Sequence, residues 1–246
     1  MADRSQLHLV VGGKYHDFNF ARLELLKLLA EHDDANVTTA SSYADIEHLT
    51  PGGGLVTYTC DVQPSEAQVT ALGNFLSAGG RWFALHGTNS AIRWLDGRPD
   101  CPDVNPALTD MLGSQFRAHP PIHAFDVHVV DRAHDLTKGL RDFRVEDELY
   151  LSTDRPGNRP LLVTQFGGDA KPFTQDSWPH AERLVMYLRT YGKGEVLYLT
   201  LGHCRGKYDL QPMIEETTIQ RCSWQSPLFY EIVRRGLRWA LGKPAL

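Results

Sequence analysis

Short apolar runs alternate with segments of helical periodicity through the first third of the chain, and this alternation constrains the fold more than any other feature. Four apolar runs predict strands, namely Leu7–Val11, Ala35–Ala40, Leu55–Tyr58 and Arg81–Leu85. Phe18–Leu29 and Ala67–Leu76 predict helices, with Asp17 as the N-cap of the first helix and Pro64 in the first turn of the second. This β-α-β-β-α-β order favours an α/β fold with a mostly parallel sheet covered on both faces.

The rest of the chain carries weaker signals of the same kind. Arg93–Pro106 is rich in proline and predicts a long loop, while Ala107–Leu112 predicts a short helix. Further elements are expected as strands at Phe125–Val130, Leu161–Gln165, Arg183–Leu188 and Glu195–Leu201, and as an amphipathic helix at Leu228–Leu241. Because no repeat, low-complexity tract or linker interrupts the sequence, residues 1–246 are expected to form a single domain.

The composition is that of a globular chain, and it argues against several classes of partner. A chain of 246 residues buries about three quarters of its unfolded surface, so the core needs no disulfide or structural metal. Lys and Arg number 25 against 30 Asp and Glu, and no stretch is strongly basic. We therefore expect neither nucleic acid nor a membrane surface as a partner.

The cysteines and the N-terminal residues bear on the compartment. The four cysteines show no C-x-x-C spacing, which argues against a zinc ribbon and against a disulfide scaffold. The N-terminal sequence MADRSQLHLVVGG lacks a long apolar segment, so it predicts no signal peptide. From these two features we expect a cytoplasmic location.

Histidines follow several of the predicted strands at the point where each strand ends. His16 comes after the first strand, His86 ends the fourth, and His203 follows the strand that begins at Glu195. In open α/β sheets, ligands bind beyond the carboxyl ends of the strands, so we expect these side chains to converge at one edge of the sheet. Cys60 reaches the same edge from the third strand.

His86 stands out among the eleven histidines. It is followed by Gly87 and by a predicted helix start at Thr88 or Asn89, so the turn resembles a nucleophile elbow that presents a side chain at the sheet edge. The positive end of such a helix would favour the neutral imidazole. We therefore predict that His86 acts as a base, an electrophile or a metal ligand.

Two further residues are candidates for the same site, and several common motifs are missing. Glu148 ends an acidic run and precedes a strand-like segment, which predicts a carboxylate that points inward, and His119 lies in an extended segment before Pro120. The sequence contains no G-x-G-x-x-G after a strand, no Walker sequence and no G-x-S-x-G. It therefore indicates neither a nucleotide cradle nor a serine acyl-enzyme.

Several short motifs are distributed along nearly the whole chain. They are Tyr15-His16-Asp17, Gly79-Gly80, Ala84-Leu85-His86-Gly87, Phe116-Arg117-Ala118-His119-Pro120, Asp147-Glu148-Leu149-Tyr150, Tyr191-Gly192-Lys193-Gly194, Leu201-Gly202-His203 and the closing segment 236–242. In order and spacing, this set resembles the ThuA-like (trehalose utilisation) family.

The resemblance implies a fold, a metabolic setting and a pocket. The fold is that of the class I glutamine amidotransferase-like superfamily, a flavodoxin-like three-layer sandwich in which His86 stands where the amidotransferases have a cysteine. The setting is bacterial catabolism of trehalose and related disaccharides, beside dehydrogenases that produce 3-keto sugars. The implied polar pocket comprises His16, His86, His119, Glu148 and His203. The segment 205–225 departs from the family pattern and is interpreted as a lid or a subunit contact.

The favoured hypothesis is an enzyme that acts on a sugar, such as a 3-keto-glycoside or a trehalose derivative. His86 or His203 would abstract the proton next to the ketone, and Glu148 would protonate the leaving oxygen. A divalent metal such as zinc, held by His16, His86 or His203, would polarise the ketone. The expected sugar contacts are Tyr15, His16, Asp17, Asn89, His119 and Trp178.

Two other hypotheses stay open. A non-catalytic sugar-binding or regulatory protein would stack aromatic side chains such as Trp94 and Trp178 on sugar rings. An amidase or peptidase would need a thiol nucleophile, for which Cys60 and Cys204 are the candidates, although neither occupies the elbow. A homodimer is expected only because symmetric dimers are common among oligomers.

Overall fold

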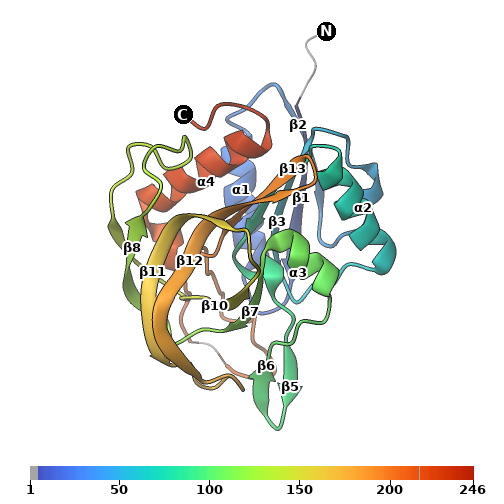
Figure 1. The fold of residues 1–246 in the computed structure, drawn as a ribbon. Helices are drawn as coiled ribbons and strands as arrows, with labels where there is room; N and C mark the ends of the chain where they lie inside the picture. The colour runs from blue at the N-terminus through green and yellow to red at the C-terminus, as the bar shows by residue number, and fades with distance from the viewer. Residues whose placement is uncertain (1–4, 216) are drawn as a thin grey trace.

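The computed structural model describes residues 5–215 and 217–246, so the first four residues of the segment that predicts no signal peptide lie outside it. A nine-stranded sheet crosses the molecule in the order β2-β1-β3-β4-β13-β12-β11-β8-β9 (Figure 1). In this order the strands are β2 (Ala35–Ala40), β1 (Ser5–Gly13), β3 (Gly54–Cys60), β4 (Arg81–Leu85), β13 (Gly194–Leu199), β12 (Ser177–Tyr191), β11 (Arg159–Asp169), β8 (His123–Val129) and β9 (Phe143–Asp147). The predicted α/β fold is confirmed.

The sheet has a parallel half and an antiparallel half. Every pairing from β2 to β13 is parallel, as the βαβ order predicts. Every pairing from β13 to β9 is antiparallel, because β11 and β12 form a long hairpin that extends the sheet. Two small sheets complete the fold, β7 (Ser114–Ala118) with β10 (Leu151–Asp154) and β5 (Arg93–Leu95) with β6 (Arg98–Asp100).

Helices cover both faces of the parallel half (Figure 1). Helices α1 (Phe18–Leu29) and α4 (Pro227–Ala240) pack on one face, and α2 (Glu66–Ser77) and α3 (Pro106–Leu112) pack on the other. Strand side chains alternate between these two layers, so that Leu9 joins the first core and Val10 the second. Since both faces are covered, a central strand such as β3 is buried over its whole length.

The helix ends follow local signals, with one correction. The carboxylate of Asp17 accepts the N–H of Phe20 and caps α1, as predicted. In α2 the N-cap is Ser65, which forms a capping box with Gln68. Pro64 therefore precedes the N-cap and does not lie in the first helical turn, so that prediction was wrong.

The region expected to be one long loop contains the hairpin β5–β6. Its two-residue turn is Asp96-Gly97, and both residues have positive φ, 51° and 76°. This is the turn type that Asp-Gly favours between antiparallel strands. The sequence pattern did not predict these strands. All of β5 is exposed, so no buried face imposes an alternation of apolar and polar residues.

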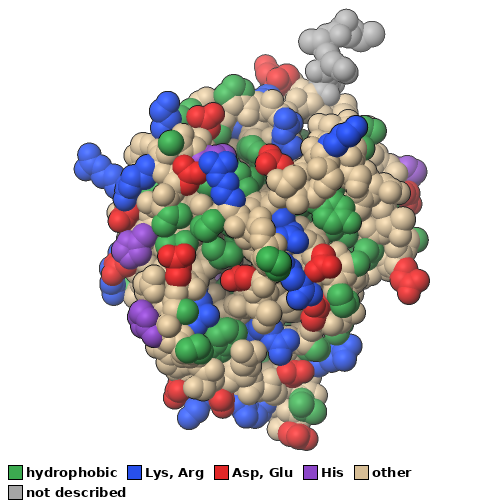
Figure 2. Space-filling view, viewed as in Figure 1, with side chains coloured by type: hydrophobic (Ala, Val, Ile, Leu, Met, Phe, Trp, Pro, Cys, Tyr) green, Lys and Arg blue, Asp and Glu red, His purple; other side chains and the backbone are tan. Residues whose placement is uncertain are grey.

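The surface and the cysteines agree with the composition. Charges of both signs are interspersed on the face shown in Figure 2. All four cysteines are buried and free, as expected for a chain without a disulfide scaffold. Within the described part of the chain, no helix has the length and apolar character needed to cross a membrane.

Candidate functional site

Three neighbouring parallel strands are followed by residues other than glycine that have positive φ. Tyr15 follows β1, Asp61 follows β3 and His86 follows β4, with φ values of 75°, 57° and 46°. Such conformations are strained by about 1–3 kcal/mol each, and they persist only where the surrounding packing enforces them. The strain is thus concentrated at the carboxyl edge of the parallel strands, where α/β proteins bind ligands.

His86 occupies the tight turn that the sequence predicts at the end of β4. Its side chain is fully buried. The next residue must be small, because a Cβ on Gly87 would lie 2.7 Å from the main-chain oxygen of Thr59 and 2.8 Å from Cβ of Cys60. The turn therefore packs directly on the end of β3.

The predicted helix start after this turn is wrong. The chain forms only η2 (His86–Asn89), a 3-10 turn of four residues, and is extended again at Ser90. Neither candidate N-cap is free for that role, because the Thr88 hydroxyl donates to the main-chain oxygen of Leu85 and the Asn89 amide donates to Ser114. The helix start expected to act on the His86 ring is therefore absent from this turn.

Main-chain carbonyls determine which nitrogen of His16 and His86 carries the proton. A carbonyl oxygen only accepts, so Nδ1 of His86 donates to Thr200 at 2.8 Å and Nδ1 of His16 donates to Lys14 at 3.3 Å. In the neutral rings both Nε2 atoms then hold lone pairs, and they face each other at 3.0 Å. The Tyr150 hydroxyl lies 3.2 Å from the same Nε2 atom of His86. The facing nitrogens need a proton or a cation between them.

A similar argument assigns the proton of His203. Nε2 of His203 lies 2.7 Å from Oε1 of Gln220, and Arg205 Nη1 donates to the same atom at 3.3 Å. A guanidinium only donates, so this atom is the amide oxygen and His203 Nε2 donates to it. Nδ1 of His203 is therefore an acceptor. It is buried without a hydrogen-bond partner and lies 3.1 Å from Oε1 of Glu148, which is another acceptor.

Glu148 lies at the centre of this cluster with its side chain 3% exposed. Its carboxylate oxygens lie 3.5 Å from His86 Nε2, 3.5 Å from His119 Nε2, 3.1 Å from His203 Nδ1 and 3.3 Å from Arg205 Nη2. Burial raises the pKa of Glu148, but its combined interactions with His119, His203 and His86 outweigh burial and hold the pKa well below its usual range. The structure thus argues against Glu148 as the acid, since an ionised carboxylate accepts protons.

Four of these side chains are arranged as metal ligands would be. The ligand atoms of His16, His86, His203 and Glu148 all lie within 4.8 Å of one another. Two ligands of a tetrahedral zinc ion are about 3.3 Å apart, and the contacts of 3.0, 3.1 and 3.5 Å bracket this value. In each imidazole, the other ring N–H donates a hydrogen bond to an oxygen atom, and such bonds orient histidine ligands in metal sites. The predicted metal candidates are thus joined by Glu148, and the set fits a divalent metal.

A cavity of about 230 Å³ opens beside the cluster. His16, Glu148 and Arg205 line its polar end. His86 and His203 have fully buried side chains and are not among the lining residues. Their side chains lie behind the residues that line the cavity, so they do not face a ligand there.

His119 is the histidine that faces the cavity with part of its ring open. Its side chain is 23% exposed, and its Nδ1 donates to the main-chain oxygen of Pro120 at 2.8 Å. Burial lowers the pKa of His119, although the Glu148 carboxylate opposes this. Its ring packs edge-on against Phe173, with centroids 4.9 Å apart. His119 therefore offers a neutral, oriented Nε2 acceptor at the polar end of the cavity.

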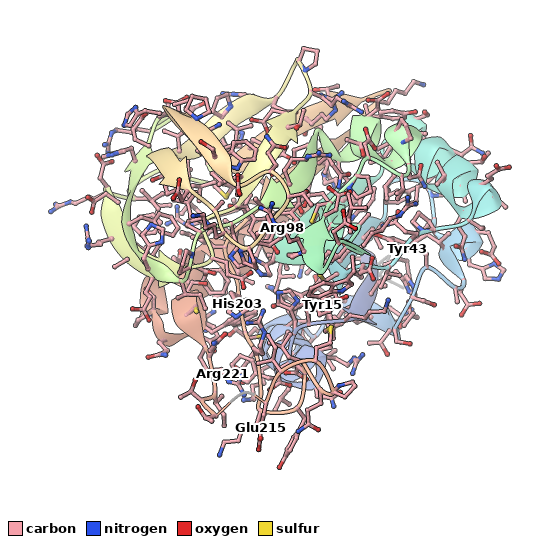
Figure 3. All side chains as sticks on the ribbon, turned by 90° about the horizontal axis from the view of Figure 1, so that it is seen from below. Tyr15, Tyr43, Arg98, His203, Glu215 and Arg221 are labelled. Atoms are coloured by element: carbon pink, nitrogen blue, oxygen red, sulfur yellow. The ribbon has the colours of Figure 1, made fainter. Side chains whose placement is uncertain are left out.

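The segment 205–221 crosses this edge and is tied to it at both ends. Arg205 Nε donates to the main-chain oxygen of Tyr15 at 3.0 Å, and Arg221 pairs with Asp17 at 2.8 Å. A β-bridge joins Arg205 to Gln220. Seen from below, Tyr15 lies near the middle of the molecule and Arg221 farther out on this segment (Figure 3). The described part of residues 205–221, within the segment 205–225 interpreted from the sequence as a lid or subunit contact, thus borders the site.

Comparison with protein families identifies the chain. The family model ThuA, described as trehalose utilisation, matches residues 9–240. The chain belongs to the ThuA family. Among solved structures, it is similar to a ThuA-like protein from Parabacteroides merdae, at 18% identity and a TM-score of 0.66 over 99% of this chain and 92% of that chain.

Two further structural relatives show the same fold. A ThuA-like protein from Bacteroides uniformis is 16% identical, with a TM-score of 0.66 over 97% of this chain and 92% of that chain. A β-galactosidase from Rahnella is 13% identical, with a TM-score of 0.56 over 98% of this chain and 32% of that chain. At these identities the likeness concerns the fold alone. No curated protein matches the chain.

The structure brings together the five pocket residues that the sequence predicts for a ThuA family member. They are His16, His86, His119, Glu148 and His203. Tyr15, one of the residues predicted as a sugar contact, also lines the cavity. In this ThuA family member the five pocket residues come from five separate regions of the chain, so the fold alone brings them together.

Three predicted sugar contacts lie elsewhere. The Asp17 carboxylate caps α1, and the Asn89 amide donates to Ser114 Oγ at 2.7 Å. Trp178 packs beneath the guanidinium of Arg183, which lies 5.1 Å from its ring centroid. The cavity wall, as far as the described residues define it, includes none of the three. Their side chains stabilise local structure, and the sequence carries no signal for that difference.

The two candidate thiol nucleophiles are in unfavourable surroundings. Burial raises the pKa of Cys60 well above its usual range and raises that of Cys204 to about 12. Cys204 lies 3.2 Å from the Tyr58 hydroxyl. Because the thiolate is the nucleophile, these environments disfavour an amidase or peptidase that uses either cysteine.

Sequence reasoning missed several residues that shape the site of this ThuA family member. Arg205 contacts Glu148, and Tyr150 contacts His86. Asp147 is fully buried, and its carboxylate accepts three main-chain N–H groups, those of Glu148, Gly202 and His203. Through these hydrogen bonds, Asp147 connects the chain at Glu148, which follows β9, to the chain at Gly202 and His203, which follow β13. Its place inside the acidic run was the available signal.

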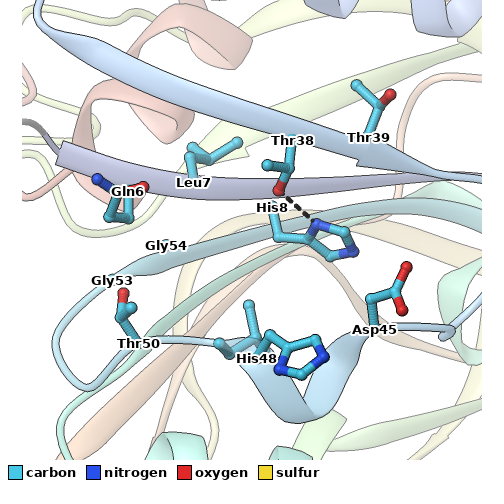
Figure 4. Close-up of a pocket in the computed structure, with 11 residues that line it drawn as sticks. Gln6, Leu7, His8, Thr38, Thr39, Asp45, His48, Thr50, Gly53 and Gly54 are labelled. Carbon is cyan, nitrogen blue, oxygen red and sulfur yellow. Dashed lines mark hydrogen bonds between the residues drawn. The ribbon is translucent and has the colours of Figure 1, made fainter.

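A second cavity, of about 280 Å³, lies at the amino ends of the parallel strands (Figure 4). It is lined by His8, whose Nδ1 is 2.7 Å from the Thr38 hydroxyl, and by Asp45 and His48. Asp45 and His48 are exposed, and this edge is opposite the one where ligands bind in such sheets. This cavity is therefore not the candidate site.

Proposed function

We propose that this ThuA family member is an enzyme of sugar catabolism that acts on a 3-keto-glycoside, such as a 3-keto derivative of a disaccharide. The observation that carries the proposal is the set of imidazole acceptors around a buried carboxylate, at one end of a cavity at the carboxyl edge of the sheet. The trehalose utilisation family supports a sugar as the substrate. The 3-keto group is part of the proposal because a ketone acidifies the neighbouring C–H bond, so that an imidazole can abstract its proton.

The proposed metal ligands are His16, His86, His203 and Glu148. A divalent metal such as zinc would act there as a Lewis acid toward the ketone oxygen. The chain itself orients these ligands through Thr200, Lys14 and Gln220. Arg205 adds a positive charge 3.3 Å from Glu148, where it favours negative charge that develops on the substrate oxygen.

His119 is the proposed base, in place of His86 or His203. Its neutral Nε2 accepts the proton from the carbon next to the ketone. The electron pair of that C–H bond forms the new C=C bond, and the glycosidic C–O bond breaks. The imidazolium then returns the proton to the leaving oxygen. The products are an unsaturated keto sugar and an alcohol, so the step needs no oxidant, reductant or covalent enzyme intermediate.

The first test is the metal content of the purified protein, measured by elemental mass spectrometry. We expect about one zinc per chain in the wild type, loss of the metal in His86→Ala, and retention in His128→Ala, a surface control whose ring is 48% exposed. A wild type that stays metal-free after incubation with zinc would refute the metal site. Retention of the metal in His86→Ala would refute its ligand set.

The second test is turnover of 3-keto-trehalose, followed as release of glucose. We expect turnover by the wild type and its loss in His119→Gln with the metal content unchanged. No turnover despite measurable binding would refute the enzyme and favour the non-catalytic sugar-binding protein. Full activity in His119→Gln would remove His119 as the base.

A further inference from the structure

The walls of the site cavity differ sharply from its polar end. Apolar side chains reach the cavity from four separate segments of the chain. They are Ile92, Trp94 and Pro99 around the hairpin β5–β6, Phe116 in β7, Pro172 and Phe173 between β11 and β12, and Leu210 and Ile214 in the segment 205–221. Tyr15, Cys60, Ser90 and Tyr150 also line the cavity and carry polar atoms, but most of the remaining wall is apolar and offers a polyol few donors and acceptors.

Two of the wall residues leave apolar surface in water. Trp94 is 52% exposed and Ile214 is 55% exposed, so both border the solvent at the mouth of the cavity. An exposed apolar surface that adjoins a cavity is a common mark of a ligand site. A ligand group that covers both side chains would remove this surface from water, which favours binding in proportion to the apolar area.

The polar and apolar parts have a fixed order along the cavity. Glu148 and the neighbouring histidines form the buried end, and the exposed Trp94 and Ile214 form the open end. The volume of about 230 Å³ is below the roughly 300–1,000 Å³ of most ligand sites. One ring of a substrate therefore fills the enclosed part, and the group attached to it lies against the apolar mouth.

We propose that the apolar mouth is a subsite for an aromatic or similarly apolar aglycone, so that the site prefers apolar glycosides to sugar–sugar disaccharides. The inference rests on the proposed function for the reacting sugar at the polar end. A second sugar at the mouth would set several hydroxyl groups against aliphatic side chains such as Ile92 and Leu210. Hydroxyl groups that lose water without gaining partners weaken binding, whereas an aryl ring loses nothing there.

The test compares binding of phenyl glucoside, methyl glucoside and trehalose to zinc-supplemented protein by calorimetry, with both anomers of each glucoside. We expect phenyl glucoside to bind at least tenfold more tightly than the other two. Trp94→Ser and Ile214→Ser should reduce this preference to threefold or less. The matched controls are Leu95→Ser in the same hairpin and Ile219→Ser in the same segment, which are 55% and 57% exposed and do not line the cavity.

The controls should keep the full preference, because they change equally exposed apolar residues outside the cavity. Equal affinity for phenyl glucoside and trehalose would overturn the subsite, as would no detectable binding of phenyl glucoside at 10 mM. Loss of the preference in Leu95→Ser or Ile219→Ser would overturn it as well.

Turnover is measured separately, with the 3-keto derivative of phenyl glucoside and with 3-keto-trehalose. Turnover without a phenyl preference in binding refutes the subsite and leaves the proposed function intact. A phenyl preference without turnover of either ketone refutes the proposed function and leaves the subsite intact.

Discussion

Replacing Glu148 by glutamine removes the charge at the centre of the site and keeps the size of the side chain. Glu148 and Arg205 are 3% and 14% exposed, and their charged atoms are 3.3 Å apart. Removing one partner of a buried ion pair destabilises a protein by about 3–5 kcal/mol, because the other charge is left uncompensated. Arg205 keeps its hydrogen bonds to Tyr15 and Gln220, so we expect the lower end of this range.

The effect is measurable by thermal unfolding of chelator-treated protein. A loss of about 3 kcal/mol lowers the Tm of a chain of this size by about 6–12 °C. The matched control is Asp126→Asn, which removes a carboxylate from Arg144 in a pair whose side chains are both 62% exposed. Exposed pairs contribute about 0–1 kcal/mol, so this control should lower the Tm by about 4 °C at most.

Zinc provides a second readout of the same variant. Zinc at a hundred times its Kd stabilises the folded wild type by about 2.7 kcal/mol, and Glu148→Gln should lose most of that gain. The reasoning is refuted if Glu148→Gln unfolds within 1 °C of the wild type after chelation. It is refuted for the metal if zinc raises the Tm of both proteins equally.

Three further outcomes are expected. Gly87→Ala should destabilise the chain by about 1–3 kcal/mol, because the new Cβ would clash with the end of β3. Gly73→Ala in α2 has no neighbour closer than 3.6 Å and should stabilise the chain by about 0.5–1 kcal/mol. Equal urea midpoints for the two variants would contradict this. Burial lowers the pKa of His8, so below about pH 6.5 the unfolded chain takes up a proton that the folded chain does not. The free energy of unfolding therefore decreases as the pH is lowered. The decrease in Tm from pH 7.5 to pH 5.5 should be smaller in His8→Gln than in the wild type. Asp147→Asn should leave one main-chain N–H unpaired and weaken zinc binding about 10–100-fold in a competition assay with a chelating dye, and unchanged affinity would mean that Asp147 does not position the ligands.

The parallel half of the sheet was predictable because its signals are local and repeated. The predicted helix Phe18–Leu29 has the bounds of α1, and the run Arg81–Leu85 has those of β4. Once these elements are known, the ends of parallel strands must meet at one edge, which brings His16 close to His86 without any knowledge of side chains. The convergence of the site was therefore a consequence of topology.

The antiparallel half was less predictable because its strands extend into solvent. The predicted strand Arg183–Leu188 is the buried part of β12, which runs from Ser177 to Tyr191. Most residues of β12 outside the predicted strand are exposed or half-buried, so they show no apolar run. The sequence thus marked where the core ends and not where the strand ends.

The contacts of Glu148 were beyond sequence reasoning for a different reason. Arg205 approaches this carboxylate from a segment without helical or strand periodicity, so its position depends on the path of the chain between Arg205 and Gln220. The ionisation of Glu148 in turn depends on that approach and on the nearby histidines. Residue type and strand position predicted that Glu148 lies in the site, but its role required the distances to its neighbours.

The elbow at the end of β4 shows how one substitution changes what this fold can do. The turn holds its residue at a φ of 46°, a strained conformation that presents the side chain at the sheet edge. A thiol there would be a nucleophile, as the amidotransferase resemblance implies. An imidazole whose Nδ1 donates to a main-chain oxygen at 2.8 Å offers instead one fixed acceptor, 3.0 Å from a second imidazole and 3.5 Å from a carboxylate. The same strained turn therefore presents an imidazole acceptor in place of a thiol nucleophile, which agrees with the proposed proton-transfer and metal chemistry.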